Sequence, residues 1–349
     1  MTSDELLVWT EGRIGRLRLN RPEALNALTH EMALGIEKAL LDWRDDPEID
    51  AVLICATGDR AFCAGGDIQD LYHSGLKSPE PGRKFWRDEY RMNALISSYP
   101  KPYVAVKNGI TMGGGVGVSA HGSHRIVTEK TMMAMPETSI GFIPDVGGTY
   151  LLSRAPGETG LYLGLTGARM NAADAIFAGF ADDYVPTERL PEFVASLTDG
   201  ASPDNAVAGV AETAPDGKLE GSQDKITQAF SQPDALGCVR ELQRMAESGD
   251  EWAEKSRNMI AKNSPFAVAA TFAAIHKARK LGSLEECLSL EYNFAYRAIA
   301  GHEFLEGIRA MVIDKDRKPD WQPPALEDVT ATMVEDALAP LGEAEWKAA

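Results

Sequence analysis

The sequence contains no apolar stretch close to the roughly 20 residues that a membrane-spanning helix needs. It also lacks an excess of basic residues, because 35 Lys and Arg stand against 52 Asp and Glu, giving a formal charge of -17. We therefore expect neither nucleic acid nor an anionic membrane surface as a partner, since nothing would neutralise their phosphates. An anionic small ligand is not excluded, because backbone amides and one or two cations can form a local positive site.

Cysteine is scarce and shows no metal-binding pattern. The four cysteines have neither CxxC nor Cys/His metal spacing, and they are Cys55, Cys63, Cys238 and Cys287. This favours a reduced intracellular protein over a disulfide framework. Residues 1–5 lack the basic region of a signal peptide and the Arg-rich character of a transit peptide. We therefore expect a cytoplasmic protein.

Strand and helix signals alternate over the first part of the chain. Residues 6–20 fit paired strands, and the apolar runs 51–56 and 103–106 fit buried strands. Thr29 is a candidate N-cap for a helix with apolar residues at helical spacing. The alternation continues to about Pro186 and predicts an α/β fold.

The remainder of the chain has a different pattern. Residues 199–221 are rich in Ala, Pro, Asp and Gly, which predicts a mobile connection. Residues 226–310 lack good strand candidates and show helical periodicity, and 326–349 fit one amphipathic helix with a loose tail. We therefore expect a core over 1–198, a connection over 199–221 and a helical C-terminal region over 222–349.

Two glycine-dense segments each follow a predicted strand, where α/β enzymes usually bind ligands. In the first, Gly65 and Gly66 permit unusual dihedral angles that expose backbone N–H groups. In the second, Gly113–Gly117 opens a predicted helix, whose free amides could bind an anion or oxyanion. Taken singly, each segment is explained equally well by close packing or a turn. Neither matches a P-loop or a Rossmann fingerprint.

Two acids, Glu137 and Asp145, lie in an otherwise neutral loop. A carboxylate pair can act as base, nucleophile or water-orienting group, particularly where burial raises one pKa. By themselves, they are better explained as helix caps. Glu89 lies on a predicted helix where a solvated charged face is the default interpretation. His121 and His124 have no evident third ligand, so we expect no metal site.

Together with the segment LNRPEALNAL at 19–28, the three loops resemble the crotonase (enoyl-CoA hydratase/isomerase) superfamily, in the same order along the chain. The resemblance implies a spiral of ββα turns followed by a helical C-terminal region. It implies that the amides of Ala64 and Gly114 hold the thioester carbonyl. It further implies that pantetheine and adenine are held by Ala24, Gly66, Asp67 and Ile68.

One subfamily within that superfamily is favoured by departures from the hydratase pattern. Hydratases usually have a catalytic glutamate at the position of Gly117, whereas the second glutamate of the pattern is present as Glu137. The segments ITMGGGVG at 110–117, AMPET at 134–138, GFIPDVGG at 141–148 and GHEFLEGIRA at 301–310 closely resemble 3-hydroxyisobutyryl-CoA hydrolases. So do IDKD at 313–316 and PDW at 319–321.

This resemblance implies hydrolysis of a short branched β-hydroxyacyl-CoA, such as (S)-3-hydroxyisobutyryl-CoA in valine breakdown. Glu137 is then a base for water or a nucleophile that forms a mixed anhydride. Asp145 orients Glu137 or the water, or bonds the substrate hydroxyl, and Glu89 holds the hydroxyacyl end. Coenzyme A belongs to the substrate, and no separate cofactor is expected.

Two alternatives remain at this stage. The first is an enoyl-CoA hydratase or isomerase that works with Glu137 and Asp145 alone. The second is a non-catalytic or RNA-binding relative, which the acidic charge disfavours. The sequence also leaves a homo-oligomer possible, since related enzymes assemble through C-terminal helices.

Overall fold

The structure is a computed structural model that describes residues 4–348. Its contacts divide the chain into two compact units, each assembled from three separate stretches. Unit 1 comprises residues 4–66, 88–133 and 170–218, and unit 2 comprises residues 67–87, 134–169 and 219–348. The units are therefore interleaved along the chain, unlike the consecutive parts expected from the sequence.

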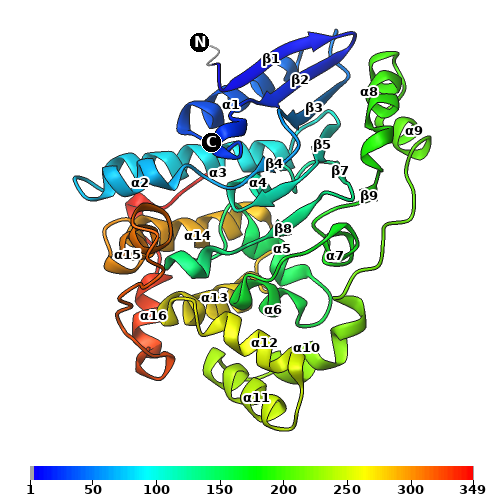
Figure 1. Cartoon of the computed structure of the whole chain (residues 1–349). Helices are drawn as coiled ribbons and strands as arrows, with labels where there is room; N and C mark the ends of the chain where they lie inside the picture. The colour runs from blue at the N-terminus through cyan, green and yellow to red at the C-terminus, as the bar shows by residue number, and fades with distance from the viewer. Residues whose placement is uncertain (1–3, 349) are drawn as a thin grey trace. The chain divides into compact units, whose positions relative to one another are not determined.

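A six-stranded sheet forms the centre of unit 1 (Figure 1). In spatial order its strands are β1 (Leu6–Glu11), β2 (Ile14–Leu19), β3 (Ala51–Ala56), β5 (Tyr103–Lys107), β7 (His124–Val127) and β9 (Asp183–Tyr184). β1 and β2 are antiparallel, and the other neighbours are parallel. The predicted hairpin and buried strands are confirmed, as is the α/β class.

β3 is continuously apolar because both faces of the sheet are covered. Val52 and Ile54 pack in a cluster with residues of α1 (His30–Arg44), whose predicted N-cap Thr29 accepts a hydrogen bond from Met32 N at 3.2 Å. Ala51 and Leu53 pack on the other face, with residues of α8 (Leu190–Thr198) and α9 (Pro203–Ala208).

The segment 199–221 is packed over part of its length, which corrects the expectation of a mobile connection. It contains α9, which begins at the N-cap Ser202. Ala206, Val207 and Val210 are buried in the core of unit 1. Small apolar residues therefore act here as core positions, although their composition resembles that of a linker.

A second, smaller sheet has the order β4 (Ala61–Cys63), β6 (Ile110–Met112) and β8 (Met132–Ala134). The two glycine-dense segments follow β4 and β6. The second contains α4 (Gly114–Gly117), a helix of four residues that is shorter than the packed helix expected there. Unit 1 also contains α7 (Ala172–Phe177) and the 3₁₀ turns η1 (Pro22–Ala24) and η3 (Thr187–Arg189).

Unit 2 is built mainly of helices (Figure 1). They are α2 (Ile68–Gly75), α5 (Gly148–Arg154), α6 (Thr159–Thr166), α10 (Gln223–Phe230), α11 (Ala235–Glu247), α12 (Glu251–Ile260), α13 (Pro265–Ala278), α14 (Leu284–Ala298), α15 (His302–Ile308) and α16 (Ala331–Ala337). α3 (Glu80–Ser97) contributes residues to both units. Within residues 4–348, no helix combines the length and apolar character needed to cross a bilayer.

An aromatic cluster lies beneath the start of the predicted catalytic loop in unit 2. The ring of Phe142 stacks on Trp86 at a centroid distance of 5.1 Å and also contacts Phe294 and Phe304. Phe142 lies two residues after the end of the 3₁₀ turn η2 (Glu137–Ile140), and its N–H donates to the carbonyl of Glu137 at 3.1 Å. The cluster therefore anchors this turn to the helical core.

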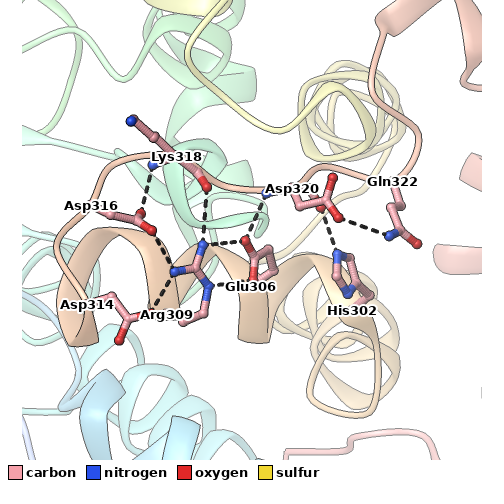
Figure 2. Close-up of polar contacts among 8 residues, drawn as sticks. All are labelled: His302, Glu306, Arg309, Asp314, Asp316, Lys318, Asp320 and Gln322. Atoms are coloured by element: carbon pink, nitrogen blue, oxygen red, sulfur yellow. Dashed lines mark hydrogen bonds and ion pairs between the residues drawn. The ribbon is translucent and has the colours of Figure 1, made fainter.

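Arg309 forms hydrogen bonds and ion pairs with the segment that follows α15 (Figure 2). Its guanidinium donates to both oxygens of Glu306 and to the carboxylates of Asp314 and Asp316. A further bond runs to the carbonyl of Lys318 at 3.1 Å. Arg309 opens a π-helical turn, η5 (Arg309–Ile313), and its bonds close the following chain back onto that turn.

The single helix expected over 326–349 is wrong. The structure has the 3₁₀ turn η6 (Leu326–Asp328), the helix α16 and the 3₁₀ turn η7 (Gly342–Ala344) instead. Pro340 lacks the N–H that a continuous helix needs, and Gly342 adopts a left-handed φ of 63°.

Three of the four free cysteines are buried, and only Cys55 is half-buried. Burial raises the pKa of the buried thiols to about 12, at Cys63, Cys238 and Cys287. These thiols therefore act as small apolar side chains of the core.

Candidate active site

In the loop after β4, some backbone N–H groups have an acceptor within the fold and others do not point toward one. Ala64 N–H donates to the carbonyl of Leu25 at 3.1 Å, so its hydrogen bond is already made within unit 1. This corrects the expectation that Ala64 supplies an oxyanion donor. The next two residues differ: Gly65 has φ 118°, and its carbonyl accepts from Leu28 N at 2.8 Å. In this parallel bridge the N–H of Gly66 points away from Leu28.

Gly66 lies beside the glycine run of α4. A Cβ atom on Gly114 would be 3.1 Å from Gly66 N and 2.8 Å from Oε1 of Glu89. A Cβ atom on Gly115 would collide with the carbonyl of Cys63. Gly114 begins α4, so its N–H has no acceptor within that helix. Unit 1 thus brings together two glycine amides that can serve as oxyanion donors.

Glu89 is buried beside these amides, with 1% of its surface exposed. The default interpretation of a solvated charged face is therefore wrong for this residue. Its neighbour on α3, Asp88, bonds His30 at 2.7 Å and Arg91 at 2.8 Å. The helix thus directs one carboxylate toward Gly114 and uses the adjacent one in an ion-pair network.

The other predicted substrate-binding residues are spread over the two units. Ala24 ends the 3₁₀ turn η1, and the following Leu25 and Asn26 have positive φ values of 53° and 55°. The Asn26 side chain holds this turn through the carbonyls of Thr57 and Ala61. Asp67 and Ile68 open α2 in unit 2, at its N-cap and first helical position. Their roles in binding CoA stay predictions.

Glu137 opens η2 in unit 2 and is nearly completely buried, at 6% exposure. Within the described part of the chain, its Oε2 has no hydrogen-bond partner. Burial raises the pKa of Glu137 well above its ordinary value, and the negative charges of Asp145 and Glu291 raise it further. A carboxyl in this state is suited to accept a proton near neutral pH.

Asp145 is also buried and begins a strained turn. The next residue, Val146, has φ 54°, a region that β-branched side chains rarely adopt. Gly147 follows with φ 81°, and Gly148 N donates to the carbonyl of Asp145 at 2.7 Å. A strained backbone beside a buried carboxylate is typical of functional sites.

The sequence reasoning missed Glu291, which is completely buried on α14. Its carboxylate accepts hydrogen bonds from Gly147 N and Thr149 N, both at 2.8 Å, and from Thr149 Oγ1 at 2.5 Å. Burial is the main cause that raises its pKa to about 8, and Asp145 adds to the effect. A lone acid in the apolar run LSLEYNFAY was the signal that could have identified it.

Two further residues missed in the sequence secure η2. Ser264 N donates to the carbonyl of Thr138 at 3.0 Å, while Ser264 Oγ bonds Glu303 Oε2. The Glu303 backbone packs so closely on Gly141 that a Cβ atom there would collide with its carbonyl. α13 and α15 therefore fix the turn that carries Glu137.

His121 and His124, for which no metal site was expected, lie in unit 1. His124 bonds Ser123 Oγ at 2.9 Å and Asp204 Oδ1 at 3.0 Å. Among residues 4–348, no group of three or more His, Cys, Asp or Glu side chains has an arrangement that could hold a metal ion.

Two curated relatives of this chain carry the same enzyme name. It is 39% identical to the mitochondrial 3-hydroxyisobutyryl-CoA hydrolase of Danio rerio, over 98% of this chain and 91% of the relative. It is 38% identical to the protein of that name from Homo sapiens, over 99% of this chain and 91% of the relative.

The expected cytoplasmic location is contradicted by these relatives, whose names place them in mitochondria. That expectation rested on the composition of residues 1–5 and on cysteine usage. A reduced, disulfide-free interior is compatible with more than one compartment.

Solved structures cover almost the whole chain. A carnitinyl-CoA dehydratase from Mycobacterium thermoresistibile is 42% identical with a TM-score of 0.94, over 99% of each chain. An enoyl-CoA hydratase from Rhodobacter sphaeroides 2.4.1 is 45% identical with a TM-score of 0.92, over 98% of this chain and 99% of that one. The enoyl-CoA hydratase/isomerase family model matches residues 14–338. This chain belongs to the 3-hydroxyisobutyryl-CoA hydrolase family of the crotonase (enoyl-CoA hydratase/isomerase) superfamily.

Proposed function

We propose that this protein hydrolyses the thioester of a short branched hydroxyacyl-CoA, namely 3-hydroxyisobutyryl-CoA, to 3-hydroxyisobutyrate and free CoA. The names of the curated relatives support this substrate. The observation that carries the proposal is the state of Glu137, which is buried and whose pKa is raised by burial and by the negative charge of Asp145. Its raised pKa suits a general base that works on water.

In the proposed reaction, the N–H groups of Gly66 and Gly114 bind the thioester oxygen as negative charge develops on it. Each such donor contributes about 3 kcal/mol in comparable sites. Glu137 takes a proton from water while the water oxygen attacks the carbonyl carbon. The tetrahedral intermediate then expels the CoA thiolate, and the proton held by Glu137 passes to that sulfur.

A covalent route uses the same residues. Glu137 attacks the carbonyl carbon, the C–S bond breaks, and a mixed anhydride forms. Water then cleaves the anhydride and restores the carboxylate. Asp145 orients the water or Glu137, or bonds the substrate hydroxyl, and Glu89 holds the hydroxyacyl end. Hydrolysis in ¹⁸O-labelled water distinguishes the routes, since only the covalent route can transfer ¹⁸O into Glu137.

Hydration of an enoyl-CoA is the second candidate, because the two solved relatives above are described as a dehydratase and a hydratase. Adding water across a double bond is easiest with two acid–base groups about one water. α4 has the buried Gly117 where hydratases usually carry one of them. This substitution favours hydrolysis.

One paired assay tests the proposal. Free CoA is measured with 3-hydroxyisobutyryl-CoA as substrate, beside loss of the enoyl absorbance of crotonyl-CoA. We expect CoA release, and we expect Glu137→Gln to remove it while CoA-ester binding remains. Glu192→Gln, on an exposed residue, is the control and should behave as wild type. Enoyl hydration without CoA release from any hydroxyacyl ester would refute the proposal.

A further inference from the structure

The carboxylate of Glu291 joins α14 to the start of α5 in unit 2. Both of its oxygens are used: Oε2 accepts from Gly147 N, and Oε1 accepts from Thr149 N and Thr149 Oγ1. We propose that Glu291 is a positioning residue for Asp145, whose turn it holds by these three hydrogen bonds. The proposal rests on the proposed function, because Asp145 belongs to that site.

The three bonds fix the turn on one side of Asp145. Gly147 and Thr149 lie two and four residues after Asp145, at the N-cap and second position of α5. These N–H groups have no acceptor within the helix, so a partner from elsewhere must satisfy them. An oxygen acceptor at this end of a helix also faces the partial positive charge of the helix N-terminus. Glu291 therefore meets both requirements with one side chain.

The turn needs such a restraint because its backbone is strained. Val146 and Gly147 both have positive φ values, at 54° and 81°. A valine in this region persists only when surrounding contacts enforce it. Bonding both Gly147 N and Thr149 N to one rigid carboxylate defines the path of the chain between Asp145 and α5.

Glu291 also contributes to the charge balance of the site. The ionisable groups it affects or is affected by are Glu137, Asp145 and Cys287. Its negative charge is one of the causes that raise the pKa of Glu137. The pKa of Glu291 is itself raised to about 8, so this charge develops as pH approaches that value. There its removal lowers the pKa of Glu137, which a purely structural role would not predict.

The test uses Glu291→Gln in the full-length protein. A glutamine keeps the size but offers only one acceptor oxygen, so its amide group opposes one of the N–H donors. We expect kcat for CoA release to fall on the order of tenfold to a hundredfold with little change in KM. The kcat/KM profiles of wild type and variant should diverge as pH approaches 8, where Glu291 gains its charge and raises the pKa of Glu137.

Matched variants separate positioning from general destabilisation. Glu285→Gln changes an acid on the same helix and should leave kcat and the pH profile unchanged. Thr149→Val removes only the hydroxyl donor and should lower kcat less than Glu291→Gln, while Thr149→Ser keeps all three bonds and should restore it. The threonine pair also tests the inference if Glu291→Gln does not fold.

Amide hydrogen exchange gives a readout that does not require activity. Glu291→Gln should speed exchange in a peptide covering 145–150 and leave a peptide from α13 unchanged. Wild-type kcat, pH profile and exchange in this variant would overturn the inference while leaving the proposed function intact. If the wild type itself released no CoA, the proposed function would fail. Amide hydrogen exchange of residues 145–150 would then test the inference on its own, and exchange in Glu291→Gln equal to that of the wild type would reject it.

Discussion

Oε1 of Glu89 lies 2.8 Å from the point that a Cβ atom on Gly114 would occupy. The same point is 3.1 Å from Gly66 N. α3, α4 and the loop after β4 therefore converge so closely that a side chain of any size at position 114 must displace one of them. The convergence explains the glycine at this position and places a carboxylate beside two amides.

We expect Gly114→Ala to reduce CoA release by about a hundredfold or more, because the new methyl group must push aside Glu89 or the Gly66 amide. The measurement is kcat beside thermal unfolding. Gly221→Ala is the control, since a Cβ atom there would meet nothing within 4 Å and should leave both unchanged. Wild-type kcat in Gly114→Ala would remove the two amides from the mechanism.

The rate of CoA release should depend on the ionisation of Glu137. As a base or nucleophile it must be deprotonated, and burial raises its pKa well above that of an ordinary glutamate. We therefore expect kcat/KM to rise with pH through a limb well above pH 4.5. A profile measured from pH 4 to 9 checks this. A limb near pH 4.5 would show that another group controls the rate.

The contribution of Glu291 to protein stability should fall as pH rises, whereas the rate of CoA release should rise. Its pKa is raised to about 8 in the folded protein, so between about pH 4.5 and 8 the folded state binds more protons than the unfolded state. Its contribution to the free energy of unfolding is therefore present at low pH and lost as pH rises, by at most about 1.4 kcal/mol per pH unit.

Urea unfolding of wild type and Glu291→Gln at pH 5, 6.5 and 8 isolates this contribution. The difference between the two proteins cancels the opposite trend from Lys107, whose pKa burial lowers well below its ordinary value. We expect the wild type to lose stability relative to the variant as pH rises. A difference that is constant across this range would contradict the assignment.

Arg309 should control the order of the chain after α15 (Figure 2). Arg309→Ala removes the bonds to Glu306, Asp314 and Asp316, and a lysine cannot replace them all because it lacks the planar fork. We expect trypsin to cut after Lys315 or Arg317 faster in both Arg309→Ala and Arg309→Lys. Arg279→Ala, which breaks only a contact with Glu158, should not change cleavage there.

Features determined by neighbouring residues could be predicted from the sequence. The N-cap Thr29 and the helix after it depend on residues three or four positions apart, and β3 is marked by its apolar run. Glu137 and Asp145 stand out as isolated acids in one loop, and the resemblance to the crotonase superfamily is what identifies them as site residues. By contrast, the helical pattern over 326–349 does not predict the break after α16, which Pro340 favours because it lacks a backbone N–H.

Features determined by contacts between distant residues could not be predicted. Glu291 bonds residues 142 and 144 positions away, and no periodicity connects them. The choice between the amides of Ala64 and Gly66 depends on which one meets the carbonyl of Leu25. The pattern CAGGD identifies the loop but not the direction of each N–H group.

The burial of Cys63, Cys238 and Cys287 has a practical consequence for kinetics. A disulfide dye such as Ellman's reagent reacts with thiolates, and these three sulfurs are shielded and protonated in the folded enzyme. When the enzyme is present at catalytic concentration, the absorbance of the reacted dye therefore measures the free CoA thiol, with little contribution from the protein's own cysteines. After denaturation in urea the same dye should titrate four groups per chain, so a single reagent can also count the folded fraction in each preparation.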